Sequence, residues 1–560
     1  MKEKYLELME KALSAYSLEH IIRYFDEVKR DGLREHGFPR LTVNIGILIA
    51  HGRRTDLLEL FCEMMEFCCK SIPRVKAAND FSVREIICCM TELEQSHVVD
   101  EETLARWKAY LSTIDPYTCY NVISTPEDPK RNWALFTGVS EFFRQQYGLC
   151  DSSEFIDIQL ASQLFWIDEN GMYKDNASSD IHQPIVYDMV PRGLFALLLH
   201  RGYRGKYYES IDAILKKTGL LMLKMQSACG EIAFGGRSNQ FIHNEPWYAL
   251  LMEYEAKRYA REGNMALAGA FKDACARAVA VTDDWLGRDP IRHIKNRYPT
   301  ETKHGCEGYA YFDKYMITAA SFLYGAYLIC DDTIPTPHKP WDDSFVFETS
   351  KHFHKLFLKS GKYSAEFDLS GDPHYDASGL GRIHRCGAPS TIALSVPCPA
   401  EPIYHVSLEK PTAVSMCPGV RMNGEWHFAT GEDTVWKCVA SESGDDFASA
   451  QISCSFSDGQ SVDGKYTVTD DGVTMQISGT GDLAFMLPAL YFDGETHAEI
   501  AVADHEITVS YAGWRCRYST DGKIVDPELC GENRNGCYKA YYACAEHTLE
   551  VRVEIDRIGA

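Results

Sequence analysis

The spacing of the apolar residues changes once along the chain, and this change limits the fold more than any other feature. Up to about residue 340, apolar residues recur three and four positions apart, which is the spacing of one helix face. Loops with Pro, Gly, Asn and Asp join these runs. The first part is therefore predicted to be helical. The spacing covers residues 41–51, 56–70, 82–95, 101–112, 133–147, 153–165, 189–201, 207–227, 246–262, 264–286 and 311–330.

After about residue 345 the apolar residues alternate with polar ones. Such a period of two is typical of strands with one buried face. Leu549, Val551, Val553 and Ile555 are an example. Asp-Gly pairs, which favour tight hairpin turns, recur between such runs. The second part is therefore predicted to be antiparallel β structure. The pairs are Asp458-Gly459, Asp463-Gly464, Asp471-Gly472, Asp493-Gly494 and Asp521-Gly522.

A proline-rich segment separates the two parts. Pro335, Pro337 and Pro340 fall within six residues, and proline cannot continue a helix because it lacks the backbone N–H. We expect an α+β multidomain protein, with an N-terminal (α/α) toroid or barrel over residues 1–340. A C-terminal antiparallel β-sandwich is expected over residues 345–560. A strict helical solenoid is not favoured, because no internal repeat is visible.

The charge and cysteine content restrict the partners and the compartment. The formal net charge of -23 argues against nucleic acid and anionic membranes as partners. No apolar run is long enough to span a membrane, and no secretory signal is recognisable. The 20 cysteines are therefore interpreted as reduced thiols of a cytoplasmic protein. No cofactor is expected, because no nucleotide-binding motif occurs, and no metal ligands are assigned, because no spacing of the His and Asp residues matches a known ligand motif. A homo-oligomer is compatible with this charge.

The richest polar cluster lies in residues 235–245, directly before an apolar helical run. Arginine can hold a carboxylate in a fork, and Asn, Gln and His can hydrogen-bond sugar hydroxyls or an enolate. The alternative is structural, with Asn244 capping the helix. Capping would use only one of the polar residues, so a binding or catalytic role is favoured. The candidates are Arg237, Asn239, Gln240, His243, Asn244 and Glu245.

Three further candidate residues precede this cluster. Trp133 follows Asn132 at the expected start of a helix, where its ring could stack on a sugar or be buried in the core. His182 and Tyr187 lie five residues apart after an Asn-Gly turn. His and Tyr are suitable for acid–base chemistry beside a carboxylate. A structural role for His182 stays open as the alternative.

A last cluster of polar and aromatic residues in the helical part lies around two glycines. It precedes the apolar helical run that ends near residue 330. Its glycines suggest a loop at a helix N-terminus, where anions bind well. The alternative is that the aromatic residues belong to the core, but the glycines favour the functional interpretation. A second segment, 372–384, is rich in His and Asp and could extend from the β part into the helical part. The candidates in the helical cluster are Lys295, Asn296, His304, Tyr309, Tyr311 and Tyr315.

The order of these motifs resembles the (α/α)-toroid polysaccharide lyases, a clan that includes heparinase-like, alginate and chondroitin lyases. Within the clan, the chain is most similar to the rhamnose–glucuronate lyases and to glucuronidases with the same two-part plan. The resemblance covers most of the chain in architecture and about five short stretches in motifs. It implies a substrate with a uronic acid beside the bond that is cut.

The resemblance also implies roles for the candidate residues. In this clan a polar residue neutralises the uronate carboxylate, a Tyr or His removes the C5 proton, and a Tyr protonates the leaving oxygen. Carried over, His182, His243 and His304 are bases or neutralisers, and Tyr187, Tyr309, Tyr311 and Tyr315 are acids. Arg237, Asn239 and Asn244 become carboxylate binders. The second tyrosine of the clan's pattern is absent, since position 191 is Pro.

Three functions follow as hypotheses. The first is a β-elimination lyase acting on uronic-acid oligosaccharides. The second is a glycoside hydrolase that releases a uronic acid with two carboxyl groups, drawn from Glu231, Glu245, Glu307 and Asp313. The third is a non-catalytic carbohydrate-binding protein, which would have an aromatic groove without a convergent set of titratable residues.

Overall fold

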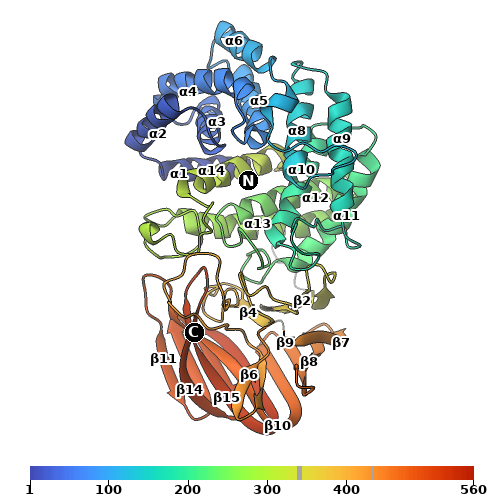
Figure 1. The fold of residues 1–560 in the computed structure, drawn as a ribbon, viewed down its shortest axis with the longest axis vertical. Coiled ribbons are helices and arrows are strands. Elements are labelled where there is room, and N and C mark those ends of the chain that lie inside the picture. The colour runs from blue at the N-terminus through green and yellow to red at the C-terminus, as the bar shows by residue number, and fades with distance from the viewer. Residues whose placement is uncertain (337–342, 432, 560) are drawn as a thin grey trace.

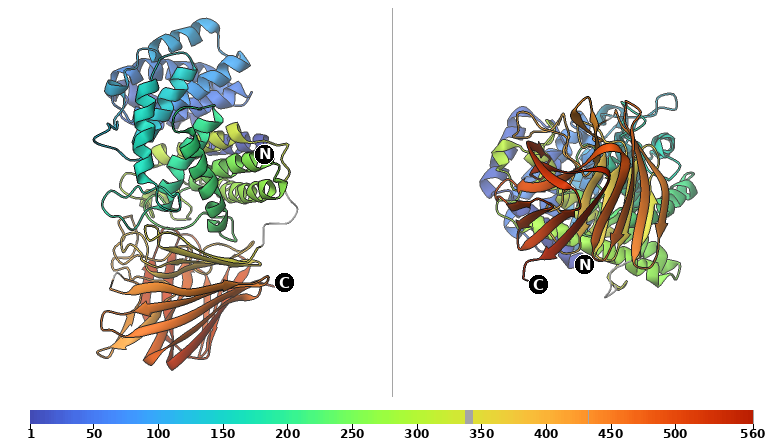
Figure 2. Two further views of the ribbon diagram at one scale, coloured as in Figure 1. Left: turned by 90° about the vertical axis from the view of Figure 1, so that its right-hand side faces the viewer. Right: turned by 90° about the horizontal axis from the view of Figure 1, so that it is seen from below.

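The computed structural model describes residues 1–336, 343–431 and 433–559. A helical part and a β part are stacked along the longest axis of the molecule (Figures 1 and 2). The last long helix ends at Ile329 and the first strand begins at Phe345. The predicted boundary at residue 340 lies outside the described residues.

The helical part consists mostly of helices of 11 residues or more joined by loops. Inner and outer helices differ in burial. Nearly every residue of the inner helix α3 is buried, whereas α2 buries only Ile21, Phe25 and Val28. The helices are α1 Lys2–Ser14, α2 Leu18–Asp31, α3 Gly37–Ala50, α4 Leu58–Ser71, α5 Asn79–Ser96, α6 Glu101–Leu111, α7 Pro116–Cys119, α8 Trp133–Gln146, α9 Ser153–Gln163, α10 Ile185–His200, α11 Tyr208–Met225, α12 Asn244–Arg261, α13 Met265–Leu286 and α14 Phe312–Ile329.

The inner helices form a closed ring. Helices α3, α5, α8, α10, α12 and α14 pack against one another in this order, and α14 returns to α3. Outer helices cover the ring, with α4 on α3, α9 on α8, and α13 on α12. This arrangement is an (α/α) toroid, as predicted. Because the ring closes, residues far apart in sequence meet at its centre.

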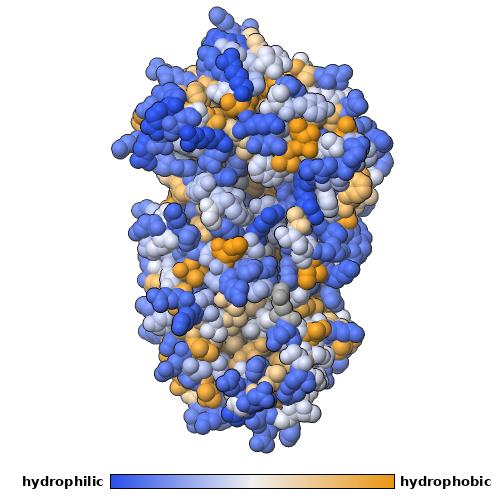
Figure 3. Space-filling view, in the orientation of Figure 1, coloured by the Kyte–Doolittle hydropathy of each residue, from blue (hydrophilic) through white to orange (hydrophobic). Residues whose placement is uncertain are grey.

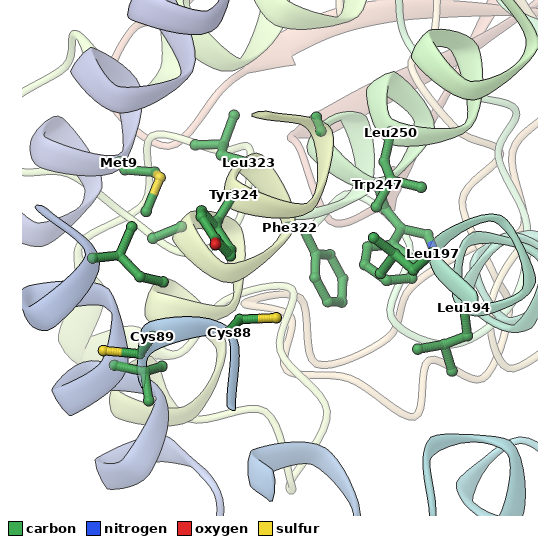
Figure 4. Close-up of a cluster of buried hydrophobic side chains, with 14 of the residues drawn as sticks. Met9, Cys88, Cys89, Leu194, Leu197, Trp247, Leu250, Phe322, Leu323 and Tyr324 are labelled. Carbon is green, nitrogen blue, oxygen red and sulfur yellow. The ribbon is translucent and has the colours of Figure 1, made fainter. Parts of the chain in front are cut away.

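Large apolar side chains from the inner helices fill the core of the ring (Figure 4). The rings of Trp247 on α12 and Phe322 on α14 lie 4.0 Å apart. Gly193 on α10 makes room for this indole, because a Cβ atom there would lie 2.4 Å from Trp247. The vicinal thiols of Cys88 and Cys89 are buried in the same core.

The close approach at Gly193 gives a stability prediction. We expect Gly193→Ala to lower the free energy of unfolding, because overpacking a core costs about 1–3 kcal/mol and exceeds the gain of at most about 1 kcal/mol in helix propensity. The midpoint of urea unfolding measures the effect. Gly308→Ala is the control, since nothing lies within 4 Å of the added methyl group there. Equal midpoints for the two variants would contradict the prediction.

The β part contains two antiparallel sheets. The small sheet has the order β1-β2-β3-β4, and the 11-stranded sheet has the main path β11-β12-β13-β15-β10-β9-β8-β7. Strands β2 and β3 pack on β8 and β9, so the two sheets share one core. The strands are β1 Phe345–Glu348, β2 Lys355–Ser360, β3 Tyr363–Asp368, β4 Gly379–Arg385, β5 Pro418–Met422, β6 Glu425–Phe428, β7 Val435–Ser443, β8 Phe447–Ser455, β9 Ser461–Thr469, β10 Gly472–Phe492, β11 Glu499–Ala503, β12 Glu506–Tyr511, β13 Trp514–Thr520, β14 Lys523–Glu532 and β15 Cys537–Arg557.

Four of the five Asp-Gly pairs lie where strands are connected, as predicted. The prediction was wrong for Asp463-Gly464, which lies inside β9 and pairs with β8 and β10. A Cβ atom at Gly464 would lie 2.7 Å from the ring of Tyr466. The glycine therefore makes space for an aromatic ring within the sheet rather than forming a turn.

The small sheet lies between the helices and the large sheet (Figure 1). Met172, Ile185 and Met225 of the helical part form an apolar cluster with Phe353 and Phe357 of the β part. Two buried hydrogen bonds reinforce it, from Phe234 N to Glu366 and from Arg382 to the Ile232 carbonyl. The two parts are therefore joined through a packed interface.

The surface is mostly polar on the face in Figure 3, where apolar residues are scattered among hydrophilic ones. None of the helices in the described residues has the length and apolar character needed to cross a membrane.

Candidate active site

A pocket of about 290 Å³ opens at one end of the helical ring. Helices α3, α8, α10 and α14 contribute to its wall, together with the loop that precedes α12. Aromatic, cationic and histidine side chains dominate the lining. The lining residues are His36, Arg40, Phe81, Asn132, Trp133, Phe136, Val186, Tyr187, Val190, Arg237, Ser238, His243, Tyr309, Lys314, Tyr315, Thr318 and Phe322.

The loop before α12 has an unusual backbone. Ser238 and Gln240 have φ angles of 56° and 64°, which non-glycine residues rarely adopt. Asn244 stabilises this conformation, because its side chain accepts a hydrogen bond from Phe241 N at 3.0 Å and donates one to the Ser238 carbonyl at 3.2 Å. Such local strain is common where a backbone must present side chains to a ligand.

Hydroxyl groups form a continuous chain in the pocket. Ser238 Oγ lies 3.2 Å from the Tyr187 hydroxyl and 2.9 Å from the Tyr309 hydroxyl. The ring of Tyr315 lies 6.0 Å from that of Tyr309. A proton could pass between the phenols of Tyr187 and Tyr309 through Ser238.

Positive charge lies next to this chain. The Arg237 guanidinium is 4.2 Å from the centre of the Tyr187 ring and forms an ion pair with the buried Asp175. Asp175 also accepts a hydrogen bond from Asn132, at 2.6 Å. Burial raises the pKa of Tyr187 above its ordinary value, while the charge of Arg237 opposes this rise. The pKa of Tyr187 is therefore lower than burial alone would make it, so Arg237 stabilises the phenolate form.

Two histidines line the pocket as neutral groups. Burial lowers the pKa of His243 to about 3, with a further contribution from Arg40. Burial and Arg40 also lower the pKa of His36. Within the described residues, the Nδ1 atoms of both rings are buried and have no hydrogen-bond partner. Either atom could bond to a hydroxyl group of a ligand.

The pocket is supported by a residue from the β part. Arg534 forms a two-pronged ion pair with Glu307, at 3.0 and 2.7 Å, and Glu307 accepts a hydrogen bond from Ser238 N at 2.7 Å. Burial alone would raise the pKa of Glu307, but Arg534 outweighs it and holds the pKa below its ordinary value. Glu307 is therefore an ionised anchor for the Ser238 loop.

The structure brings together six of the residues that the sequence singled out. They come from four separate segments of the helical part and line the same pocket. These residues are Trp133, Tyr187, Arg237, His243, Tyr309 and Tyr315.

Several other candidates are buried in supporting interactions outside the pocket lining. Glu245 forms an ion pair with Lys295 at 2.6 Å, and both are nearly inaccessible to solvent. Asn296 donates hydrogen bonds to the carbonyls of His304 and Arg534. The His304 ring stacks on Tyr298 and bonds to the Asn533 carbonyl. The contacts of Asn296 with Arg534 and of His304 with Asn533 join the helical part to the β part.

The remaining candidates also lie outside the lining. Asn239 and Gln240 are buried and hydrogen-bond within their loop and to Asn535, while Asn244 supports the loop as described. His182 lies against the β part, with its ring 5.3 Å from that of His354. Tyr311 is 54% exposed at the start of α14. Its exposure leaves it accessible to water rather than enclosed with the other tyrosines.

The sequence interpretation missed His36, Arg40 and Lys314, and did not single out Asn132 or Ser238 as site residues. One signal was available, since Arg40 is the only charged residue in helix α3, which is mostly apolar. A charge within such a helix usually has a specific partner or ligand. Here Arg40 bonds to Glu85 and to Thr318. No comparable signal marks His36 or Lys314.

The chemical content of the pocket is distinctive. Among the described residues, no aspartate or glutamate lines it. In the same part of the chain, no group of three or more His, Cys, Asp and Glu side chains is arranged to hold a metal ion. The groups available for chemistry are therefore phenols, a serine hydroxyl, neutral imidazoles and cations.

Comparisons with known proteins give matches in structure alone. No protein-family model and no curated protein matches the sequence. The fold is similar to that of a mutant heparan sulfate lyase from Pedobacter heparinus, with a TM-score of 0.51 and 8% identity, over 94% of this chain and 77% of that chain. A chondroitin AC lyase from Streptomyces coelicolor A3 gives a TM-score of 0.49 and 11% identity, over 99% and 79% of the two chains.

The similarity to the heparan sulfate lyase establishes the class of fold. The helical ring followed by antiparallel sheets is the architecture that this chain has in common with that structure, which confirms the predicted fold class. The narrower likeness to rhamnose–glucuronate lyases and glucuronidases stays a prediction.

Proposed function

We propose that this chain is a lyase that cleaves uronic-acid-containing oligosaccharides by β-elimination. The observation that carries the proposal is the lining of the pocket, which contains three tyrosines and three cationic side chains but, within the described residues, no carboxylate. Elimination needs a base, an acid and a group that neutralises the substrate carboxylate. Phenols and a guanidinium can supply all three. The architecture shared with polysaccharide lyases adds support.

In the proposed reaction, Arg237 binds the uronate carboxylate, which makes the C5 proton more acidic. Tyr187 acts as a phenolate and removes that proton. The electron pair forms the C4–C5 double bond and expels the oxygen at C4. Tyr309 donates its proton to this oxygen, and Ser238 then lets the proton gained by Tyr187 return to Tyr309. Both tyrosines regain their starting states.

A hydrolase is less well supported by the positions of the acidic residues. Hydrolysis requires two carboxyl groups about 5–10 Å apart across the bond. Glu245 is paired with Lys295 and Glu307 with Arg534, both away from solvent. Glu231 lies near Lys295 and Arg382, and Asp313 pairs with His20. The pocket described here offers neither an acid nor a base of this kind.

A short substrate fits the pocket better than a long polymer. Its volume of about 290 Å³ is at the lower end of the roughly 300–1,000 Å³ typical of ligand sites. The net charge of -23 also disfavours the approach of a long polyanion. We therefore propose oligosaccharides with one uronate near the chain end, handled in the cytoplasm, as substrates.

The test is to incubate the protein with rhamnosyl-glucuronate and with disaccharides from heparan and chondroitin. A lyase creates a conjugated unsaturated uronate, which absorbs in the ultraviolet, and mass spectrometry detects the same product. Release of a saturated uronic acid with uptake of water would instead establish hydrolysis. Binding of these sugars without any product would favour the carbohydrate-binding alternative.

The pH dependence distinguishes the two possible bases. If Tyr187 is the base, kcat/KM should rise about tenfold per pH unit through neutral pH, because burial raises its pKa and the active phenolate is scarce there. If His243 is the base, kcat/KM should be constant above about pH 5, since the pKa of His243 is about 3. A flat profile would therefore overturn the assignment of Tyr187.

A further inference from the structure

A second cavity, of about 370 Å³, lies at the end of the helical ring opposite the first pocket. Residues from the C-terminal ends of α10 and α12 and from the beginning of α11 line it. Basic residues are unusually frequent for so acidic a protein. The lining consists of Leu199, His200, Arg204, Tyr208, Asp212, Tyr254, Lys257, Arg258, Arg261 and Glu262.

The acidic residues of this cavity are already neutralised. Asp212 forms an ion pair with Arg258 at 2.7 Å, and Glu262 forms one with Lys216 at 2.8 Å. Arg258 is held by Glu255 as well. These contacts leave the other cations of the cavity without a counter-charge from its own carboxylates.

Three cations remain. Within the described residues, Arg204, Lys257 and Arg261 form no ion pair with any carboxylate. Arg204 donates only to the carbonyls of Leu199 and Tyr203, and Arg261 donates through Nε to the Lys257 carbonyl. Both guanidinium groups therefore keep N–H donors for a ligand.

Helix dipoles partly oppose this positive charge. The C-terminal ends of α10 and α12 each carry the equivalent of about half a negative charge. Together they amount to roughly one negative charge, which is smaller than the three unpaired cations. His200, which also lines the cavity, is neutral near pH 7, since burial and then Lys257 and Arg201 lower its pKa to about 4. The field in the cavity therefore favours an anion.

Aromatic surfaces accompany the cations. Arg204 lies 4.5 Å from the centre of the Tyr208 ring, and Tyr254 lines the opposite helix. The cavity is larger than a single oxyanion requires and falls in the range of small-molecule sites. Cations beside aromatic rings suit a molecule with an anionic ester group and a larger uncharged body.

We propose that this cavity binds a small phosphorylated or sulfated molecule, such as a sugar ester, at a site separate from the catalytic pocket. The two sites occupy opposite ends of the same helices. Tyr187 is near the start of α10 and His200 at its end, and His243 directly precedes α12 while Arg261 ends it. A helix of 16 residues spans about 24 Å, so one ligand does not fill both pockets.

Calorimetric titration of the full chain tests the proposal. The probes are glucose-6-phosphate and glucose-6-sulfate, with inorganic phosphate and sulfate beside them. We expect at least one ester to bind, and Lys257→Ala and Arg261→Ala each to weaken its binding about tenfold or more. The preferred ester distinguishes a phosphorylated from a sulfated ligand. Lys437→Ala and Lys523→Ala remove exposed charges of the β part and should leave binding unchanged.

Two results would overturn the proposal: no binding of any probe, or equal weakening by the control variants, which would indicate a general effect of net charge. A second readout locates the ligand. A bound anion should raise the pKa of His200, measured by proton NMR, and this rise should disappear in Lys257→Ala. No uronide is present in these experiments, so their outcome is independent of the proposed lyase activity.

Discussion

Replacing Tyr187 by phenylalanine is expected to lower kcat/KM for elimination by about 100- to 10,000-fold, the contribution typical of a positioned acid or base. The change removes one hydroxyl group and keeps the ring beneath Arg237. The chain from Tyr187 through Ser238 to Tyr309 is then broken at its first member. Initial rates of unsaturated product formation measure the effect.

The matched control is Tyr311→Phe, since Tyr311 is exposed and lies outside the pocket. It should retain full activity. Tyr187→Phe should also bind the reaction product with the affinity of the unaltered chain, because binding depends on Arg237 rather than on the phenol. Activity within about threefold of the unaltered chain in Tyr187→Phe, far less than a lost acid or base causes, would remove Tyr187 from the mechanism.

Arg534→Ala should reduce both stability and activity. Removing one partner of a buried ion pair costs about 3–5 kcal/mol because the other charge remains buried without compensation. That other charge is Glu307, which also accepts the hydrogen bond from Ser238 N. The Ser238 loop should therefore lose its anchor. The urea midpoint and kcat/KM are the two measurements.

Two further variants separate charge from geometry. Arg534→Lys keeps the positive charge but cannot form the two-pronged contact. Compared with Arg534→Ala, this variant should therefore regain more of its stability than of its activity. Arg517→Ala removes a partly exposed arginine paired with Glu554 on neighbouring strands and should cost less than about 1 kcal/mol. If Arg534→Ala lowered the free energy of unfolding by as little as Arg517→Ala does, other groups would have to stabilise the buried charge of Glu307.

The architecture was predictable because local spacing determines it. Inner helices such as α3 and α14 are apolar around most of their circumference, and β15 alternates between buried and more exposed residues from Leu549 to Ile555. Asp463-Gly464 was misread as a turn, because the sequence does not reveal that Gly464 makes room for Tyr466. A local pattern identifies an element but not the side chain that packs against it.

The site was predictable only in part, for a related reason. Local polar density located Arg237, His243 and Tyr309, but it could not separate residues that face the pocket from those that face the core. Glu245 and His243 are two positions apart, yet one pairs with Lys295 and the other lines the pocket. Arg534, 227 positions after Glu307, is brought to the site by tertiary packing alone.

The contact between Arg534 and Glu307 has a consequence for the order in which a newly made chain matures. Helices form from local contacts, so the ring can assemble while later segments are still being synthesised. The Ser238 loop acquires its anchor only after residue 534 has emerged and β10 has paired with β15. During translation the ring would therefore be folded before the Ser238 loop is anchored, and the pocket would be completed only with the last strands.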